Sequence, residues 1–225
     1  MCQCEGCKLY QIGTTDPVCI PLPSNHIQGC IISRDPTNEF LKPLQFYKRH
    51  FPLKPKNLFF DAPPCWLVKR IIQFRNLNEN SSDIINLKRF LDEQCYWTHL
   101  HKCPTCKATK KQEKFLEIGT EKNSRFPPFR YSNAKYCGNS WFETEFNKYE
   151  LEDKIYILLG RDVEKFFDQW SKSYFDSDGT NVIHLPHPSS ANCGKGWSWN
   201  KESKDKEKIV REIDRLFKLI NKGPL

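Results

Sequence analysis

The chain has 225 residues, of which 38% are hydrophobic and 28% are charged, a composition typical of a globular protein with one α/β domain. There is no run of 18 apolar residues and no signal-like N-terminal segment. We therefore expect an intracellular protein without a membrane span. The net charge of +8 permits a polyanionic partner but does not require one.

The N-terminus is rich in cysteine, and the whole chain holds eleven cysteines. An odd number cannot pair completely within one chain, and disulfides are uncommon in reducing compartments. Metal ligation by a subset explains the excess better than disulfide bonding does. Cys4 and Cys7, in the short knuckle at residues 2–7, are the first candidate ligands.

The first predicted strand covers residues 29–33, a short apolar run that Pro36 brings to an end. Asp35 follows the strand and is presented at the sheet edge by the proline. A carboxylate at this place can orient a water molecule or stabilise a developing cation. Asp-Pro is also a common turn pair, so an ordinary turn aspartate is the alternative interpretation.

Three helices are predicted in the middle of the chain, at residues 66–74, 83–90 and 141–146. One strand is predicted between the second and third of them, starting at residue 95. The strand runs into a loop that contains His99 and Cys103. Residues 104–135 are polar, basic and without a clear period. We interpret them as an insertion in a single domain that spans residues 1–225.

In the last third of the chain, strands are predicted at residues 154–160 and 181–185. Helices are predicted at residues 162–171 and 203–222. Asp162 is the predicted cap of the first of these helices, and Ser203 is the predicted cap of the second. Strands that alternate with helices predict a four-stranded, mostly parallel sheet with helices on both faces. This is a three-layer α/β/α architecture.

Functional residues of parallel sheets gather at the carboxyl ends of the strands. Asp35, His99 and His187 each stand at or just past such an end, and they converge if their strands are neighbours. His187 lies between Pro186 and Pro188, which leaves its backbone little freedom. Its imidazole can therefore be aimed to donate a hydrogen bond to an oxygen that gains negative charge.

The segment at residues 191–199 combines glycines, a lysine and two tryptophans. This mixture suits a loop that touches phosphates and inserts apolar groups into a base stack. A surface loop that its tryptophans pin to the core is the alternative interpretation.

Four segments of the chain, in the same order, resemble the uracil-DNA glycosylase superfamily. Residues 33–37 resemble the first motif of that family, and residues 187–189 resemble its His-Pro-Ser motif. The strand that ends at Gly160 resembles the strand between those motifs. The resemblance implies the three-layer α/β/α fold of the family, a catalytic role for Asp35 and stabilisation of the base oxyanion by His187.

The fourth segment is similar to the branch of this family that carries a 4Fe-4S cluster. The resemblance implies a cluster held by Cys4, Cys7, Cys103 and Cys137, the last being a later cysteine ahead of a helix. The interval between the last two is longer than is usual in the family, so Cys106 competes with Cys137. With Cys106 as the fourth ligand, the site would suit zinc instead. Either metal would be structural.

The resemblance further implies a monofunctional DNA glycosylase of base excision repair, which hydrolyses the N-glycosidic bond of uracil or another deaminated base flipped out of DNA. His99 stands where the family usually has an asparagine that reads the uracil edge, which leaves the preferred base open. We expect a monomer in the cytoplasm or nucleoid. The residues expected to contact the substrate, besides His99, are Phe40, Phe46, Ser189 and Asn192, and those expected to contact DNA are Ser190, Lys195 and Trp197.

A non-catalytic protein is the alternative function. It would have the same fold, bind nucleic acid and carry a structural zinc site. Binding to uracil-containing DNA without release of the base would distinguish it from the enzyme.

Overall fold

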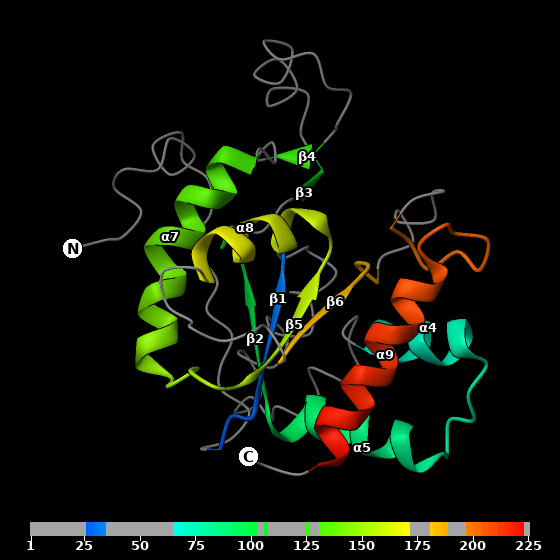
Figure 1. Cartoon of the computed structure of the whole chain (residues 1–225). Helices are drawn as coiled ribbons and strands as arrows, with labels where there is room; N and C mark the ends of the chain where they lie inside the picture. Colours follow the sequence, from blue (N-terminus) through cyan, green and yellow to red (C-terminus); the bar gives the residue numbers. More distant parts are fainter. Residues whose placement is uncertain are drawn as a thin grey trace.

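The computed structural model describes residues 26–34, 65–102, 106–107, 125–126, 131–171, 181–188 and 197–222. A four-stranded sheet lies at its centre, and all neighbouring strands of this sheet run parallel (Figure 1). In spatial order the strands are β2 (Cys95–His99), β1 (Gly29–Ser33), β5 (Ile155–Leu159) and β6 (Val182–Leu185). The four predicted strands are therefore confirmed.

Helices cover both faces of the sheet (Figure 1). One face packs against α4 (Cys65–Arg75), α5 (Ser82–Glu93) and α9 (Lys206–Asn221). The opposite face packs against α7 (Tyr131–Lys148) and α8 (Arg161–Ser171). This arrangement confirms the three-layer α/β/α architecture. None of the described helices is both long enough and apolar enough to traverse a bilayer.

The strands are mostly apolar, as expected of a parallel sheet with both faces buried. Successive side chains of a strand point to opposite faces. Ile31, Ile157 and Ile183 accordingly join the core on the α4, α5 and α9 side, whereas Ile32 and Leu158 join the core on the α7 and α8 side. Packing from both sides makes the carboxyl edge of the sheet a firm base for the segments that follow the strands.

Helix α7 is much longer than the predicted helix at residues 141–146. It begins at Tyr131, inside the stretch interpreted as an insertion, where the sequence has no clear apolar period. Tertiary contacts support this part of the helix. Cys137 is buried, and Gly138 lies so close to Phe166 that an added Cβ would be 2.8 Å from the ring.

Two short strands also lie in the stretch interpreted as an insertion and were not predicted. They are β3 (Cys106–Lys107) and β4 (Arg125–Phe126), which pair antiparallel. A pair of two-residue strands is too short to produce a recognisable alternation of polar and apolar residues in the sequence.

The starts of two helices differ from the predicted caps. Helix α8 begins at Arg161, so Asp162 lies in its first turn, and the prediction of Asp162 as the cap is wrong. Helix α9 begins at Lys206 with Asp205 at the N-cap position, so Ser203 is not the cap either. Ser203 Oγ instead accepts a hydrogen bond from the Asp205 N–H at 3.2 Å.

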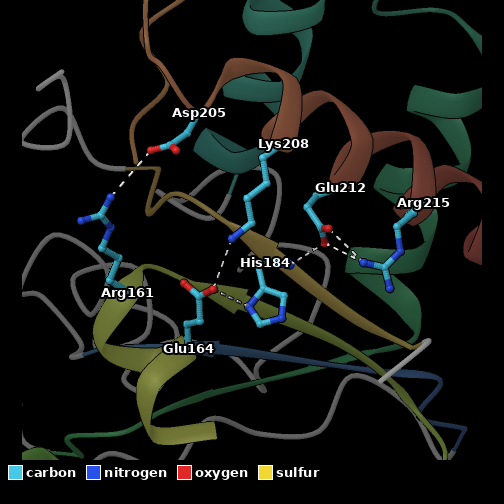
Figure 2. Close-up of polar contacts among 7 residues, drawn as sticks. All are labelled: Arg161, Glu164, His184, Asp205, Lys208, Glu212 and Arg215. Carbon is cyan, nitrogen blue, oxygen red and sulfur yellow. Dashed lines mark hydrogen bonds and ion pairs between the residues drawn. The ribbon is translucent and has the colours of Figure 1, made fainter. Parts of the chain in front are cut away.

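Strand β6 lies at one edge of the sheet, and side chains of α8 and α9 cover this edge (Figure 2). Glu212 accepts a hydrogen bond from the His184 N–H at 3.0 Å, and Arg215 Nη1 lies 2.9 Å from the same carboxylate. His184 Nδ1 and Lys208 Nζ each lie 3.5 Å from Glu164 Oε1. These contacts cover the edge strand, and a covered edge resists pairing with another chain. Because His184 takes part in them through its N–H and its imidazole, we assign it a structural role.

Candidate active site

The carboxyl ends of the four strands meet at one edge because the strands are parallel. Ser33 at the end of β1 is in register with His99 at the end of β2. The pairing continues past both strands, because the His101 N–H donates a hydrogen bond to the Arg34 carbonyl oxygen at 2.9 Å. The two segments therefore leave the sheet side by side, up to the residue before Asp35.

Residues 186–188 turn toward the end of the neighbouring strand, β5. Gly160, the residue after β5, donates its N–H to the Leu185 carbonyl oxygen at 2.9 Å. Its φ of 98° lies in the region that favours glycine, and a Cβ at this position would be 3.7 Å from His187 Cβ. His187 thus lies against the end of β5, which is one strand closer to β1 than its own strand is.

Side chains from distant elements bind three successive carbonyl groups of this turn. Trp199 Nε1 donates to the carbonyl oxygens of Pro186 and His187, at 3.0 and 3.2 Å. Arg70 Nε, on α4, donates to the carbonyl oxygen of Pro188 at 3.1 Å. Each proline also fixes its own φ. The backbone of the half-buried His187 is therefore held in place on both sides.

His99 is buried, and its imidazole is neutral. Burial lowers the pKa of His99 well below its ordinary value, and the charges of Lys102, His187 and His101 lower it further. The effect of His187 means that the two imidazoles lie close enough for their charges to interact. A neutral ring keeps one N–H donor and one acceptor nitrogen, so His99 can both donate and accept a hydrogen bond.

The buried neutral state of His99 predicts a pH dependence of stability. The unfolded chain takes up a proton near pH 6.5, whereas the folded protein keeps His99 neutral at this pH. The free energy of unfolding should therefore fall as the pH falls below about 6.5, by up to about 1.4 kcal/mol per pH unit from this group.

Replacing His99 with asparagine should make this decline shallower. Urea denaturation between pH 7 and pH 5 measures it, with His26→Asn at an exposed position as the control. Equal pH slopes for the wild type and His99→Asn would show that folding does not lower the pKa of His99.

A buried ion pair ties the segment after β2 to helix α7. Lys102 Nζ lies 2.7 Å from both carboxylate oxygens of Glu145, and both side chains are buried. Thr98 Oγ1 donates a hydrogen bond to Glu145 Oε2 at 2.6 Å and accepts one from Lys102 Nζ. Because Thr98 precedes His99 and Lys102 follows His101, these contacts fix the path of the chain through both histidines.

The family model of the uracil DNA glycosylase superfamily matches residues 22–214. The chain belongs to this superfamily. The match includes all four strands of the parallel sheet and both segments that carry histidines at its carboxyl edge. No curated protein and no solved structure matches the chain.

Of the four cluster ligands predicted for this superfamily member, only Cys137 lies in the described part. Its Sγ is buried and accepts a hydrogen bond from the Lys102 N–H at 3.3 Å. The contact joins α7 to the segment after β2. Cys137 lies inside α7, so the expectation that it stands ahead of the helix is wrong. No group of three His, Cys, Asp or Glu side chains in the described ranges could hold a metal ion, and the cluster stays a prediction.

Trp197, a predicted DNA contact, is buried, and Lys208 Nζ lies 4.6 Å from the centre of its ring. Its burial agrees with the alternative in which the tryptophans pin the segment to the core, and its contact with DNA stays a prediction. The other predicted site residues lie outside the described residues: Asp35, Phe40, Phe46, Ser189, Ser190, Asn192, Lys195, Cys4, Cys7 and Cys103.

Sequence reasoning did not identify the two residues that hold the turn around His187. Arg70 is separated from Pro188 by 118 positions, so no local pattern relates them. Trp199 belongs to the segment at residues 191–199, for which the sequence leaves two interpretations open: contact with DNA, and a loop that its tryptophans pin to the core. Trp197 and Trp199 directly precede a polar stretch, and two large aromatic residues at such a place indicate contact with the core.

Proposed function

We propose that this member of the superfamily is a monofunctional DNA glycosylase. It would hydrolyse the N-glycosidic bond of uracil, or of another deaminated base, flipped out of DNA. Family membership supports glycosylase chemistry in general. The observation that carries the proposal is the fixed position of His187, whose turn is bound by Arg70 and Trp199. A donor fixed before the reaction stabilises developing charge well because it does not need to reorganise.

In the proposed reaction the bond between the sugar C1′ and the base nitrogen breaks, and its electron pair leaves with the base. His187 donates a hydrogen bond to the base oxygen that gains negative charge, which lowers the barrier by about 3 kcal/mol. Asp35 stabilises the positive charge on the sugar and orients a water molecule. The water oxygen bonds to C1′, Asp35 accepts its proton, and the departed base is protonated afterwards.

The proposal of a water nucleophile is supported by the state of Lys102. An enzyme that forms a Schiff base needs a lysine with a free amine. Lys102 is the lysine closest in sequence to His99, and its amine is buried and bound by Glu145 at 2.7 Å. It is therefore unsuited to attack the sugar.

We propose that His99 contacts the edge of the flipped base. Uracil, hypoxanthine and xanthine each present a carbonyl oxygen next to a ring N–H, and a neutral imidazole can bind either group. Extrusion of the base from the stack is required because the bond is shielded inside the duplex. The net charge of +8 supports binding to the DNA backbone.

We also propose that Cys4, Cys7, Cys103 and Cys137 hold a structural 4Fe-4S cluster. The support is the buried Cys137 thiol, which receives a backbone N–H, since such hydrogen bonds stabilise cluster sulfurs. The cluster would tie the N-terminus to α7 and takes no part in bond cleavage. Zinc with Cys106 as the fourth ligand is the alternative. Brown protein that absorbs visible light supports the cluster, and colourless protein that contains zinc supports the alternative.

A base-release assay tests the proposed function. Purified protein is incubated with oligonucleotides that contain uracil, hypoxanthine or xanthine, and abasic sites are detected by alkaline cleavage. We expect release of at least one of the three bases. Asp35→Asn should lower the rate about 100-fold or more, because it removes the group that orients the water.

Asp168→Asn, at an exposed position on α8, is the matched control and should keep the wild-type rate. Tight binding to these oligonucleotides without release of any base would contradict the proposal. That result would favour the non-catalytic binding protein.

A further inference from the structure

The outer face of helix α4 carries an exposed tryptophan beside two cationic side chains. Leu67, Val68, Ile71 and Phe74 face the core of the protein. The opposite side of the first two turns is formed by Trp66, Lys69, Arg70 and Gln73, which recur at helical spacing. We call these four residues the α4 outer face.

This face adjoins the turn that carries His187. Arg70 Nε donates a hydrogen bond to the carbonyl oxygen of Pro188, which directly follows His187. A guanidinium has five N–H donors, and this bond uses one of them. A strand of nucleic acid whose nucleotide reaches His187 would therefore pass close to Arg70.

The charge on α4 is entirely positive. The helix contains Lys69, Arg70 and Arg75 and no acidic residue. Arg75, at the far end, pairs with Asp214 of α9 at 2.8 Å. Within the part of the chain that the structure describes, neither Lys69 nor Arg70 has an ion-pair partner.

Trp66 differs from the other described tryptophans in its exposure. It is 41% exposed, whereas Trp141 is half-buried and Trp97, Trp170, Trp197 and Trp199 are buried. An aromatic ring beside cationic side chains is the combination with which proteins hold unpaired nucleotides. The ring stacks on a base while the cations contact phosphates.

We propose that the α4 outer face binds unpaired nucleotides of the DNA strand that enters the candidate active site. Lys69 and Arg70 contact phosphates, and Trp66 stacks on a base next to the flipped nucleotide. The inference rests on the proposed function for its choice of DNA as the partner. Beyond the proposed function, it names the α4 outer face as the surface that binds the DNA strand and states that the bound nucleotides are unpaired.

Fluorescence anisotropy with a labelled single-stranded oligonucleotide without damaged bases, and with the duplex of the same sequence, tests this inference. Trp66→Ala should weaken binding of the single strand about tenfold, with a smaller effect on the duplex. Lys69→Ala should weaken binding and reduce the slope of log K against log salt by about 0.7.

Two matched variants serve as controls. Tyr136→Ala removes an aromatic side chain of the same 41% exposure from α7, in the opposite layer, and Lys218→Ala removes an exposed lysine from α9. Both should bind like the wild type. Urea denaturation of all four variants checks that they are folded.

Binding by Trp66→Ala within twofold of the wild type would overturn the inference, and so would equal losses in the two controls. Equal losses for the single strand and the duplex would overturn the assignment to unpaired nucleotides. The oligonucleotides carry no target base, so these results do not depend on base release. A wild type that binds DNA in this manner but releases no base would overturn the proposed function alone.

Discussion

Replacement of Glu145 with alanine is expected to lower the free energy of unfolding by about 3–5 kcal/mol. The substitution leaves the Lys102 ammonium buried without the carboxylate that now lies 2.7 Å away. It also removes the acceptor of the Thr98 hydroxyl. Urea denaturation followed by circular dichroism measures the loss, which is a large fraction of the stability of an ordinary domain.

Glu143→Ala, at an exposed position on the same helix, is the control and should change the stability by less than about 0.5 kcal/mol. The double variant Lys102→Met and Glu145→Leu should recover most of the lost stability. The reason is that removing both charges also removes the cost of burying them. A Glu145→Ala protein within 1 kcal/mol of the wild type would mean that water reaches Lys102 and that the pair is not truly buried.

The parts of the fold that could be predicted are those with a strong local pattern. The run at residues 29–33 is apolar up to Ser33 and ends before Pro36, and the structure places β1 at Gly29–Ser33. Helix α8 buries Phe166, Phe167 and Trp170 on one stripe, and its predicted range differs by one residue. In such segments the local pattern and the tertiary packing require the same conformation.

The first half of α7 could not be predicted because tertiary packing stabilises it. Its sequence there is mixed, with polar residues and a glycine between the aromatic ones. Gly138 has a low helix propensity, but the absence of a side chain lets the helix approach Phe166 closely. Contacts of this kind join residues that are far apart in the chain, so a local pattern does not report them.

The candidate site also has one part that a local sequence pattern predicts and another part that depends on residues far apart in the chain. The restraint that Pro186 and Pro188 place on His187 can be read from three adjacent residues. The contacts that complete this restraint come from Arg70 and Trp199, which are 118 and 12 positions from their acceptors. The buried pairing of Lys102 with Glu145 spans 43 positions. The sequence therefore predicts the backbone restraint on His187, and the structure adds the two side chains that bind the carbonyl groups of its turn.

Replacing His187 with alanine is expected to lower kcat for base release about 100- to 1000-fold and to leave KM little changed. The imidazole would act on a negative charge that is fully present only in the transition state, so its loss affects the chemical step more than binding. Single-turnover kinetics on the best substrate of the base-release assay measures this step directly. A kcat equal to that of the wild type would remove His187 from the mechanism.

Trp199→Phe then separates the donor from the residue that positions it. The change removes the indole N–H that binds the carbonyl groups of Pro186 and His187, but it keeps an aromatic ring against Phe74. We expect a loss in kcat of about tenfold, because the turn moves more freely while the imidazole remains. In a protein that already carries His187→Ala, the same change should cost almost nothing, since no donor is left to position. Losses that multiply in the double variant would show that Trp199 contributes to the reaction by a route that does not pass through His187.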